Sequence, residues 1–298
     1  MLLFVSWIKA FLKNILVYMK KMMVFIGLIF CTIVHSQSIK MMTYNIRLDV
    51  ASDGVNAWPL RKDFFASQIQ FYEPDILGVQ EAMPHQVVDL EQLLSQYSQV
   101  GIGREGIGKG ESSNIFYKKD RFTIIQTNTF WLSDTPEIIS KGWDAACHRV
   151  CTYALFQDAI TKKIFWVFNT HLDHIGEQAR TKGIALILSK IKELNTKNYP
   201  VFFMGDFNSE PLEARIISLK TQMDDTREIA IHKPFGPIGT FNNFEHNLSV
   251  TKRIDYIFVS KKVNLIIKKY AVLSDSDALK YPSDHLPVYV EVSFNPKK

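Results

Sequence analysis

The feature that most constrains this chain is a set of short apolar runs, each of which ends abruptly in polar residues. The clearest one runs from Val201 to Met204 and is followed by Gly205, Asp206 and Asn208. Bounded apolar runs of this length are typical of buried strands, and open α/β folds bind ligands just past the carboxyl ends of strands. A carboxylate and an amide two residues apart suit a water or phosphate oxygen beside a hard cation. An ordinary strand-to-helix turn contains the same residue types, so this run alone leaves both interpretations open.

Several other apolar runs end in the same way. The polar residues at or beside their ends are Asn45, Glu81, His171, Asp255, Asp284 and His285. Each of them taken singly has an ordinary structural role, but convergence of these ends would make a pocket rich in carboxylate and imidazole. Oxygen ligands without thiolates favour Mg²⁺ or Mn²⁺, with Ca²⁺ as a third candidate, over zinc. Two histidines among carboxylates can divide the acid and base roles of a hydrolysis.

The order of the predicted elements indicates one layered α/β domain. Strands are expected over residues 39–46, 75–81, 114–117, 149–156, 164–170 and 201–204. One helix is expected to open at Pro59 with Leu60, Phe64 and Ile69 on its apolar face, and another to open near Ser209. Strands and helices mix without strict alternation, and no linker or repeat interrupts the chain after Ile39.

The N-terminal segment differs from the rest of the chain in its charge. Residues 1–36 contain four lysines and no acidic residue, with an apolar run before Ser36, which predicts a secretory signal peptide cleaved near Ser36. An uncleaved membrane anchor is the alternative. Either one predicts that the domain formed by residues 37–298 is secreted or periplasmic. Of the 35 basic residues of the chain, 31 therefore belong to this domain beside 30 acidic ones, so it has no broad basic field for long nucleic acid.

Three cysteines provide no disulfide framework. Cys147 and Cys151 are four residues apart in an expected strand, which separates them by roughly 13 Å, too far for a bridge. We expect both to be reduced core thiols. The glycine-rich passage 101–110 is expected to be a flexible loop at the mouth of a site.

Six motifs, in this order along the chain, resemble the endonuclease/exonuclease/phosphatase superfamily. They are Tyr44-Asn45, Gln80-Glu81, Asn169-Thr-His-Leu-Asp173, Gly205-Asp-Phe-Asn208, Arg253-Ile-Asp-Tyr256 and Ser283-Asp-His285. The resemblance runs from about Ile39 to Val292. It implies a four-layered α/β sandwich in which helices flank two packed mixed sheets. It also implies hydrolysis of phosphodiesters or phosphomonoesters with a divalent metal. Phe130-Trp-Leu-Ser133 and Trp143-Asp-Ala-Ala-Cys147 resemble a branch of secreted bacterial members.

The same resemblance implies roles for the metal ligands and for the residues around the attacking water. Glu81 matches the principal metal ligand of the family, with Asn45 and Asp284 beside it. Asp206 and Asn208 match the pair that positions the nucleophilic water and the scissile phosphate.

Further roles follow for the histidines and the residues around them. His285, paired with Asp255, matches the histidine that assists water activation. His171 matches the histidine that stabilises the charge on the phosphoryl group and protonates the leaving oxygen, and Glu111 resembles the acid that orients it. Arg149 matches a phosphate-binding arginine of some nucleases.

The chain is therefore expected to be a secreted hydrolase of phosphodiester bonds that uses in-line attack of an activated water. The alternatives are a phosphomonoesterase for a small metabolite or a lipid head group, and a catalytically silent binding module. The expected partner is a phosphoester (nucleic acid, lipid head group or small metabolite) and no protein, with a monomeric chain. Trp143 and Trp58 are candidates for the rim of a narrow substrate pocket, with core packing as the alternative role.

Overall fold

The computed structural model describes residues 7, 11–21 and 38–294. The contacts within the chain divide it into two units, Met1–Gln37 and Ser38–Lys298. In the first unit, residues 11–21 are helical. Within the described ranges, no helix is long and apolar enough to cross a bilayer. The apolar run of the predicted signal peptide, Cys31 and the predicted cleavage position at Ser36 lie outside the described residues.

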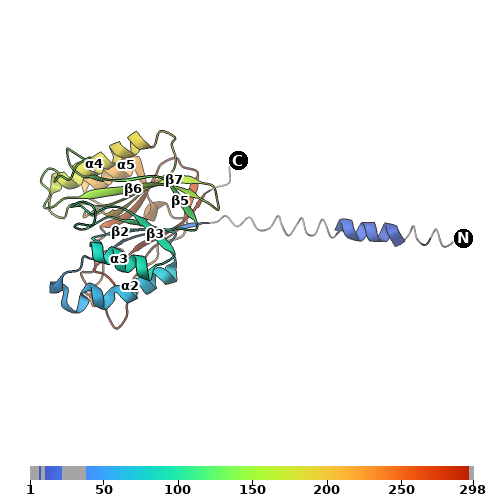
Figure 1. Cartoon of the computed structure of the whole chain (residues 1–298), viewed down its shortest axis with the longest axis horizontal. Coiled ribbons are helices and arrows are strands. Elements are labelled where there is room, and N and C mark those ends of the chain that lie inside the picture. The colour runs from blue at the N-terminus through green and yellow to red at the C-terminus, as the bar shows by residue number, and fades with distance from the viewer. Residues whose placement is uncertain (1–6, 8–10, 22–37, 295–298) are drawn as a thin grey trace. The chain divides into compact units, whose positions relative to one another are not determined.

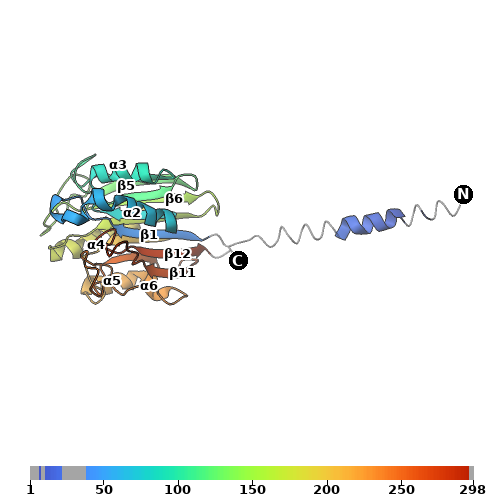
Figure 2. The same ribbon diagram turned by 90° about the horizontal axis from the view of Figure 1, so that it is seen from below.

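The second unit contains two six-stranded sheets. The first has the strand order β11-β12-β1-β2-β4-β3. Its strands are β1 (Ile39–Asn45), β2 (Ile76–Gln80), β3 (Tyr97–Val100), β4 (Ile115–Lys118), β11 (Leu265–Val272) and β12 (Val288–Phe294). Within it β1 and β2 run parallel, and every other neighbouring pair is antiparallel. Figure 2 shows β1, β12 and β11 side by side.

The second sheet repeats this plan, with the strand order β5-β6-β7-β8-β10-β9. Its strands are β5 (Phe122–Trp131), β6 (Val150–Asp158), β7 (Ile164–His171), β8 (Val201–Asp206), β9 (Met223–Asp225) and β10 (Asp255–Ser260). Here β7 and β8 form the parallel pair, and their neighbours are antiparallel. Both sheets are therefore mixed, as predicted.

Helices cover the outer faces of the two sheets. They are α2 (Trp58–Tyr72), α3 (Pro84–Leu93), α4 (Glu177–Leu194) and α5 (Ala214–Gln222). The other described helices of this unit are the short α6 (Thr226–Ile229) and the 3-10 helix η1 (Ala51–Asn56). Apolar residues of α2 and α3 pack on the first sheet, and those of α4 and α5 pack on the second. Figure 1 shows the resulting four layers, which confirm the predicted sandwich.

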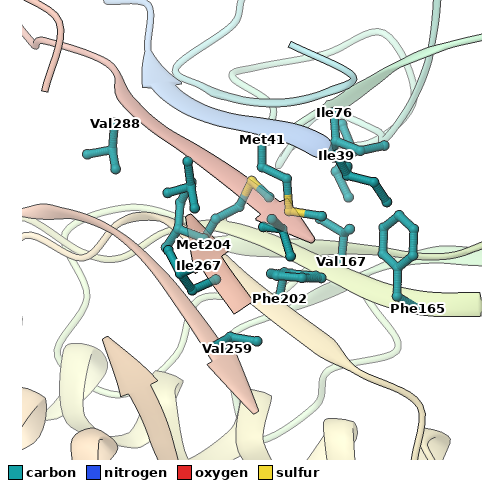
Figure 3. Packing of buried hydrophobic residues seen from close by; sticks show 14 of the residues in the cluster. Ile39, Met41, Ile76, Phe165, Val167, Phe202, Met204, Val259, Ile267 and Val288 are labelled. Atoms are coloured by element: carbon teal, nitrogen blue, oxygen red, sulfur yellow. The ribbon is translucent and has the colours of Figure 1, made fainter. Parts of the chain in front are cut away.

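The space between the two sheets is filled by apolar side chains from both. Met41 and Ile76 of the first sheet meet Phe165, Val167 and Met204 of the second (Figure 3). Because helices cover the other face of each sheet, the central strands are buried on both sides. Burial on both faces explains why these strands appear in the sequence as continuous apolar runs.

The predicted apolar face of α2 was right for Ile69, which is buried, and wrong for Leu60. Leu60 is 73% exposed, whereas Trp58, Arg61, Phe65 and Ile69 are buried. The helix is rotated from the expected face because the Arg61 guanidinium lies inside the fold and hydrogen-bonds to backbone carbonyls. A hydrophobic pattern assigns an arginine to solvent, so it could not locate this face.

Two local predictions also need correction. The helix expected near Ser209 begins at Ala214, because the carbonyl of Ser209 accepts a hydrogen bond from Tyr256 and residues 210–213 form a turn. Cys147 precedes β6 and is half-buried, so it is not a core thiol. Cys151 is buried in β6, and both thiols are free, as predicted.

Candidate active site

The two parallel strand pairs carry the candidate residues at their carboxyl ends. Asn45 is the last residue of β1, and Glu81 directly follows β2. His171 and Asp206 are the last residues of β7 and β8. Parallel neighbours end at the same edge of a sheet, so each pair brings two polar side chains together. A hydrogen bond of 3.0 Å from Nδ2 of Asn45 to Oδ2 of Asp206 joins the ends of the two sheets.

One row across the second sheet carries three of these side chains. His171 is in register with Asp206 across β7 and β8, and Asp206 is in register with Asp255 across β8 and β10. Residues in register on neighbouring strands project from the same face of a sheet. The strand pairing therefore places an imidazole and two carboxylates beside one another.

These residues border a cavity of about 470 Å³. It is lined by Arg47, Leu48, Asp53, Glu81, Arg104, Glu111, Cys147, Arg149, His171, His174, Asp206, Asn208, Phe241, Asn243, Phe244, Lys252, Ile254, Asp284 and His285. Of the predicted site residues, the structure thus brings all to the cavity wall except Asn45, Asp255 and the two rim candidates, Trp58 and Trp143. Asn45 and Asp255 lie directly behind the wall, where each is hydrogen-bonded to a residue that lines the cavity.

Asn45 holds two carboxylates in place. Its Nδ2 donates to Oε1 of Glu81 and to Oδ2 of Asp206, each at 3.0 Å, and its Oδ1 accepts from the backbone N–H of Arg47. Glu81 also accepts from the N–H of Leu48 and has a φ of 63°, a left-handed conformation that is costly for a non-glycine residue. Such strain persists where surrounding contacts enforce it, which here are the hydrogen bonds to both carboxylate oxygens.

Asp206, His285 and Asp255 form a buried charged group. Nδ1 of His285 lies 2.8 Å from Oδ2 of Asp255, and its Nε2 lies 3.8 Å from Oδ2 of Asp206. Burial lowers the pKa of His285, but the two carboxylates outweigh it and raise the pKa to about 10. The pKa of Asp206 is raised to about 7, mainly by burial and next by the charge of Asp255. His285 is therefore an imidazolium at neutral pH, while Asp206 titrates near neutrality.

His171 is in a different electrostatic state. Its pKa is lowered well below the usual value, mainly by burial and next by the charge of Arg149, so the ring is neutral. Its Nε2 lies 3.0 Å from Nδ2 of Asn208, which can only donate. Nε2 is then the acceptor and the proton is on Nδ1, which lies 4.0 Å from Oε1 of Glu81. A neutral donor can stabilise charge on a phosphoryl oxygen, but its acidity is too low for the predicted protonation of the leaving oxygen to be its main task.

The predicted role of Glu111 is not supported. Its carboxylate forms an ion pair of 2.6 Å with Arg104 and has no hydrogen bond to His171. Glu111 does line the cavity, where burial raises its pKa despite the charge of Arg104. Arg149 also reaches the cavity and is held by Asp173 at 3.3 Å, so the predicted phosphate contact remains open to it.

The structure does not bring Trp143 to the site. Its Nε1 donates to Asp134, and the ammonium of Lys182 lies 5.6 Å from its ring centroid. The neighbouring Asp144 accepts from the N–H groups of Gln178 and Ala179 in the first turn of α4, so this segment packs on a helix end. Trp58, the other rim candidate, is 1% exposed in the core.

The family of the chain follows from a comparison with known proteins. The model of the Endonuclease/Exonuclease/phosphatase family matches residues 42–285, which contain every predicted site residue. The chain belongs to this family.

Two solved structures are similar to this chain over nearly their whole length. A mannosyl-6-phosphatase of Bacteroides thetaiotaomicron is 38% identical with a TM-score of 0.82, over 86% of this chain and 100% of that one. An endonuclease/exonuclease/phosphatase family protein of the same organism is 37% identical with a TM-score of 0.83, over 88% of this chain and 99% of that one.

A more distant curated relative is the Ccr4 exoribonuclease subunit of the CCR4-Not complex of Saccharomyces cerevisiae. It is 22% identical over 80% of this chain and 35% of its own length, so the chain spans about a third of that protein. Relatives in the family are thus hydrolases of nucleic acids and of sugar phosphates. The chain is an enzyme of the same class, a metal-dependent phosphoester hydrolase.

Endonuclease/exonuclease/phosphatase family members use divalent metals, and the donor set of this chain fits one. Asp206, Asp255 and His285 offer ligand atoms within 4.8 Å of one another. Burial raises the pKa of Asp206 and that of Asp284, which is the response of carboxylates that lack enough positive charge. Glu81 and Asp284 at the cavity wall would hold a hard cation through oxygen.

The structure adds cavity residues that the sequence analysis missed. They are Arg47, Leu48, Asp53, Arg104, Cys147, His174, Phe241, Asn243, Phe244, Lys252 and Ile254. Most of them lie in loops, where no periodic pattern assigns a direction to a side chain. Arg47 had a usable signal, because it follows Asn45 by two residues beyond the end of β1.

Proposed function

We propose that this chain is a divalent-metal-dependent phosphomonoesterase that acts on a small phosphorylated sugar. The cavity of about 470 Å³ carries the proposal. Its size is within the range of pockets for small ligands, about 300–1,000 Å³. An enzyme for long nucleic acid would instead use an extended basic groove. The near balance of 31 basic and 30 acidic residues after residue 36 gives no support for such a surface.

Local positive charge at the cavity suits a phosphate group. Arg47, Arg104, Arg149 and Lys252 all line it. Three of these side chains are oriented by carboxylates: Arg47 by Asp53, Arg104 by Glu111 and Arg149 by Asp173. Such cations attract a phosphate dianion at short range without producing a broad field. The similarity to the mannosyl-6-phosphatase supports a sugar as the rest of the substrate.

The site can catalyse hydrolysis in one displacement. A water oxygen forms a bond to phosphorus while the bond from phosphorus to the sugar oxygen breaks. Asp206, whose pKa near 7 suits a base at neutral pH, accepts the proton of the water. The charged His285 is held in place by Asp255, and it stabilises the negative charge beside the carboxyl group of Asp206. The departing sugar oxygen takes a proton from solvent water and leaves as a hydroxyl group. Asp206 returns the proton that it accepted to solvent, and inorganic phosphate is the second product.

Other residues position the phosphate. Asn208 directs an amide toward His171 and has a φ of 45°, so its backbone is held in a strained conformation at the cavity wall. His171 donates through a neutral ring, and Arg149 contributes charge. A bound divalent cation would neutralise the charge of the phosphoryl oxygens. Glu81 and Asp284 are the residues that would hold it.

A phosphodiesterase, the first expectation from the sequence, is the second candidate function, and the similarity to the exoribonuclease subunit Ccr4 favours it. The test compares mannose 6-phosphate and glucose 6-phosphate with bis(p-nitrophenyl) phosphate, in Mg²⁺, Mn²⁺ or Ca²⁺ and in excess chelator. Release of inorganic phosphate from the sugars, with little diester cleavage, is the expected result. Diester cleavage at least tenfold faster than monoester cleavage would replace the proposal by the second candidate. The His171→Ala protein controls for contaminating phosphatases.

We also propose that the enzyme is secreted or periplasmic. The basic and then apolar character of residues 19–34 supports this proposal. Fractionation of cells that produce the full chain should place the protein outside the cytoplasm, with Gln37 as its first residue. A cytoplasmic protein that keeps residues 1–36 would contradict the proposal, and an exported protein that keeps them would indicate the anchor.

A further inference from the structure

One part of the cavity wall is aromatic. Among the described residues that line the cavity, only Phe241 and Phe244 have phenyl rings. Neither of them belongs to a hydrophobic core cluster, and both are partly exposed. Their rings are therefore not explained by packing of the core.

Phe241 marks the end of this wall that is close to the reacting groups. Its ring lies 5.1 Å from that of His285 at an interplanar angle of 67°, an edge-to-face contact. The two residues also form an antiparallel bridge. The ammonium of Lys252 lies 5.4 Å from the centroid of the same ring. The wall thus begins directly beside the imidazolium of the charged group.

Phe244 is presented by a strained loop. Asn243 and Phe244 have φ values of 53° and 59°, so two successive non-glycine residues are left-handed. Each such residue costs about 1–2 kcal/mol. The backbone would relax unless other contacts enforced this conformation.

The enforcing contacts come from the segment that carries the catalytic residues. The N–H groups of Asn242 and Asn243 donate to the carbonyl of Asp284 at 2.8 and 3.0 Å. The buried side chain of Asn242 donates to the carbonyl of Ser283 and accepts from the N–H of Phe244 at 2.7 Å. The Phe244 ring also lies 5.8 Å from the guanidinium of the buried Arg61. The loop is therefore fixed to the segment that holds Asp284.

We infer that Phe244, with Phe241 beside it, is the platform on which the sugar ring of the substrate packs, and that it determines which phosphomonoesters the enzyme prefers. A sugar has an apolar C–H face that suits a phenyl ring and hydroxyl groups at its edge. Other polar side chains of the cavity wall, such as Asn243 and His174, supply donors and acceptors for hydroxyls. The inference rests on the proposed function, because it names the part of the substrate beyond the phosphate.

The first test compares two substrates that share a primary alkyl phosphate. Mannose 6-phosphate contains a ring, and glycerol 3-phosphate does not. In Phe244→Leu, the ratio of kcat/KM for mannose 6-phosphate over glycerol 3-phosphate should fall about three- to tenfold, mainly through a higher KM. Phe71→Leu is the matched control, because Phe71 is 79% exposed on α2 and does not line the cavity. An unchanged ratio in Phe244→Leu would overturn the inference, because both substrates would then depend equally on this side chain.

The second test measures contact with the ring without hydrolysis. Ligand-observed saturation-transfer NMR on the full chain in excess chelator should show transfer to the ring protons of mannose 6-phosphate. The transfer should be lost in Phe244→Leu and kept in Phe71→Leu. If the wild-type enzyme hydrolyses only diesters, the proposed function fails, and this measurement still decides whether Phe244 contacts a sugar. Transfer to adenosine monophosphate but not to the sugar would refute the sugar platform in favour of a base platform.

Discussion

Oδ2 of Asp255 lies 2.8 Å from Nδ1 of His285. The strand register also places the carboxylate of Asp255 next to a second carboxylate, that of Asp206. Asp255 is the first residue of β10 and is in register with Asp206, the last residue of β8. The imidazolium of His285 therefore lies between two carboxylates. Its orientation depends on Asp255, while its other nitrogen is directed to the carboxylate that is proposed to accept a proton.

Replacement of Asp255 by asparagine should disable the enzyme without unfolding it. An amide cannot hold the same charge state of His285, so we predict that kcat falls about 10²–10⁴-fold. Steady-state kinetics with a phosphoester substrate would measure the effect, and a far-UV circular dichroism spectrum equal to that of wild type would show that the variant is folded. A kcat within threefold of wild type would remove the pair from the mechanism. Asp224→Asn, at the partly exposed middle position of β9, is the control.

Replacement of Glu81 by glutamine should weaken binding of the metal. The wild-type chain should be stabilised by Mn²⁺ or Mg²⁺ in a thermal-shift titration, because a ligand of the folded state raises the midpoint. In Glu81→Gln, we predict that at least tenfold more metal is needed for the same shift. Excess chelator should abolish both the shift and the activity in wild type. Equal titration curves for the two proteins would exclude Glu81 as a ligand.

Replacement of Arg61 by lysine should lower the free energy of unfolding. It should also raise the metal concentration that is needed for the thermal shift of the preceding titration. The guanidinium donates to the carbonyls of Ile46, Arg47, Asn56 and Pro282, which lie in the segments on either side of the site. A lysine has one donor group and cannot reach all four, so we predict a loss of about 2–3 kcal/mol, or about 5–10 °C in the thermal midpoint. Lys62→Gln, at a partly exposed ion pair of the same helix, should change stability by less than about 1 kcal/mol.

Asp173 should make the free energy of unfolding of the chain decrease at acidic pH. Burial raises the pKa of this carboxyl, but the N–H groups of Gly176, Ala146 and Ile175 and the charge of Arg149 outweigh it and hold the pKa well below the usual range. The unfolded chain, with an ordinary pKa of about 3.9, therefore binds the proton more readily. The contribution of Asp173 is complete above that value and is lost as the pH falls below it.

The measurement for Asp173 is the free energy of unfolding of wild type and Asp173→Asn between pH 7 and pH 3. We predict a deficit of about 3 kcal/mol at pH 7, which narrows as the pH falls below about 4. Asp120→Asn, at an exposed turn position, is the control. A deficit that stays constant over the whole range would show that the effect is steric rather than due to the charge.

The fold and the centre of the site could be predicted because both depend on strand ends. Central strands buried on two faces must be continuously apolar, so a polar residue such as Asp206 or Glu81 marks where the strand stops. Neighbouring strands that stop at one edge then bring these ends together. The face of α2 could not be predicted, because Arg61 is buried by hydrogen bonds to carbonyls that no local pattern reveals.

The periphery of the site could not be predicted for a related reason. Glu111 and Trp143 were placed by motif, but their partners, Arg104 and Asp134, are set by loops. Phe244 is directed by two left-handed residues and by hydrogen bonds to a segment about 40 residues away. Such directions depend on tertiary contacts, which composition and periodicity do not encode.

The pairing of β1 with β12 ties the site to the order in which a ribosome makes the chain. Asn45 emerges before β12, so one edge of its strand remains open until β12 pairs with it. Asp284 and His285 lie just before β12 and emerge together with the strand that closes this edge. A nascent chain that stops before Asp284 cannot hold the complete set of reacting groups. The hydrolase therefore acquires its activity only when β12 pairs with β1, a contact between segments that are far apart in the sequence.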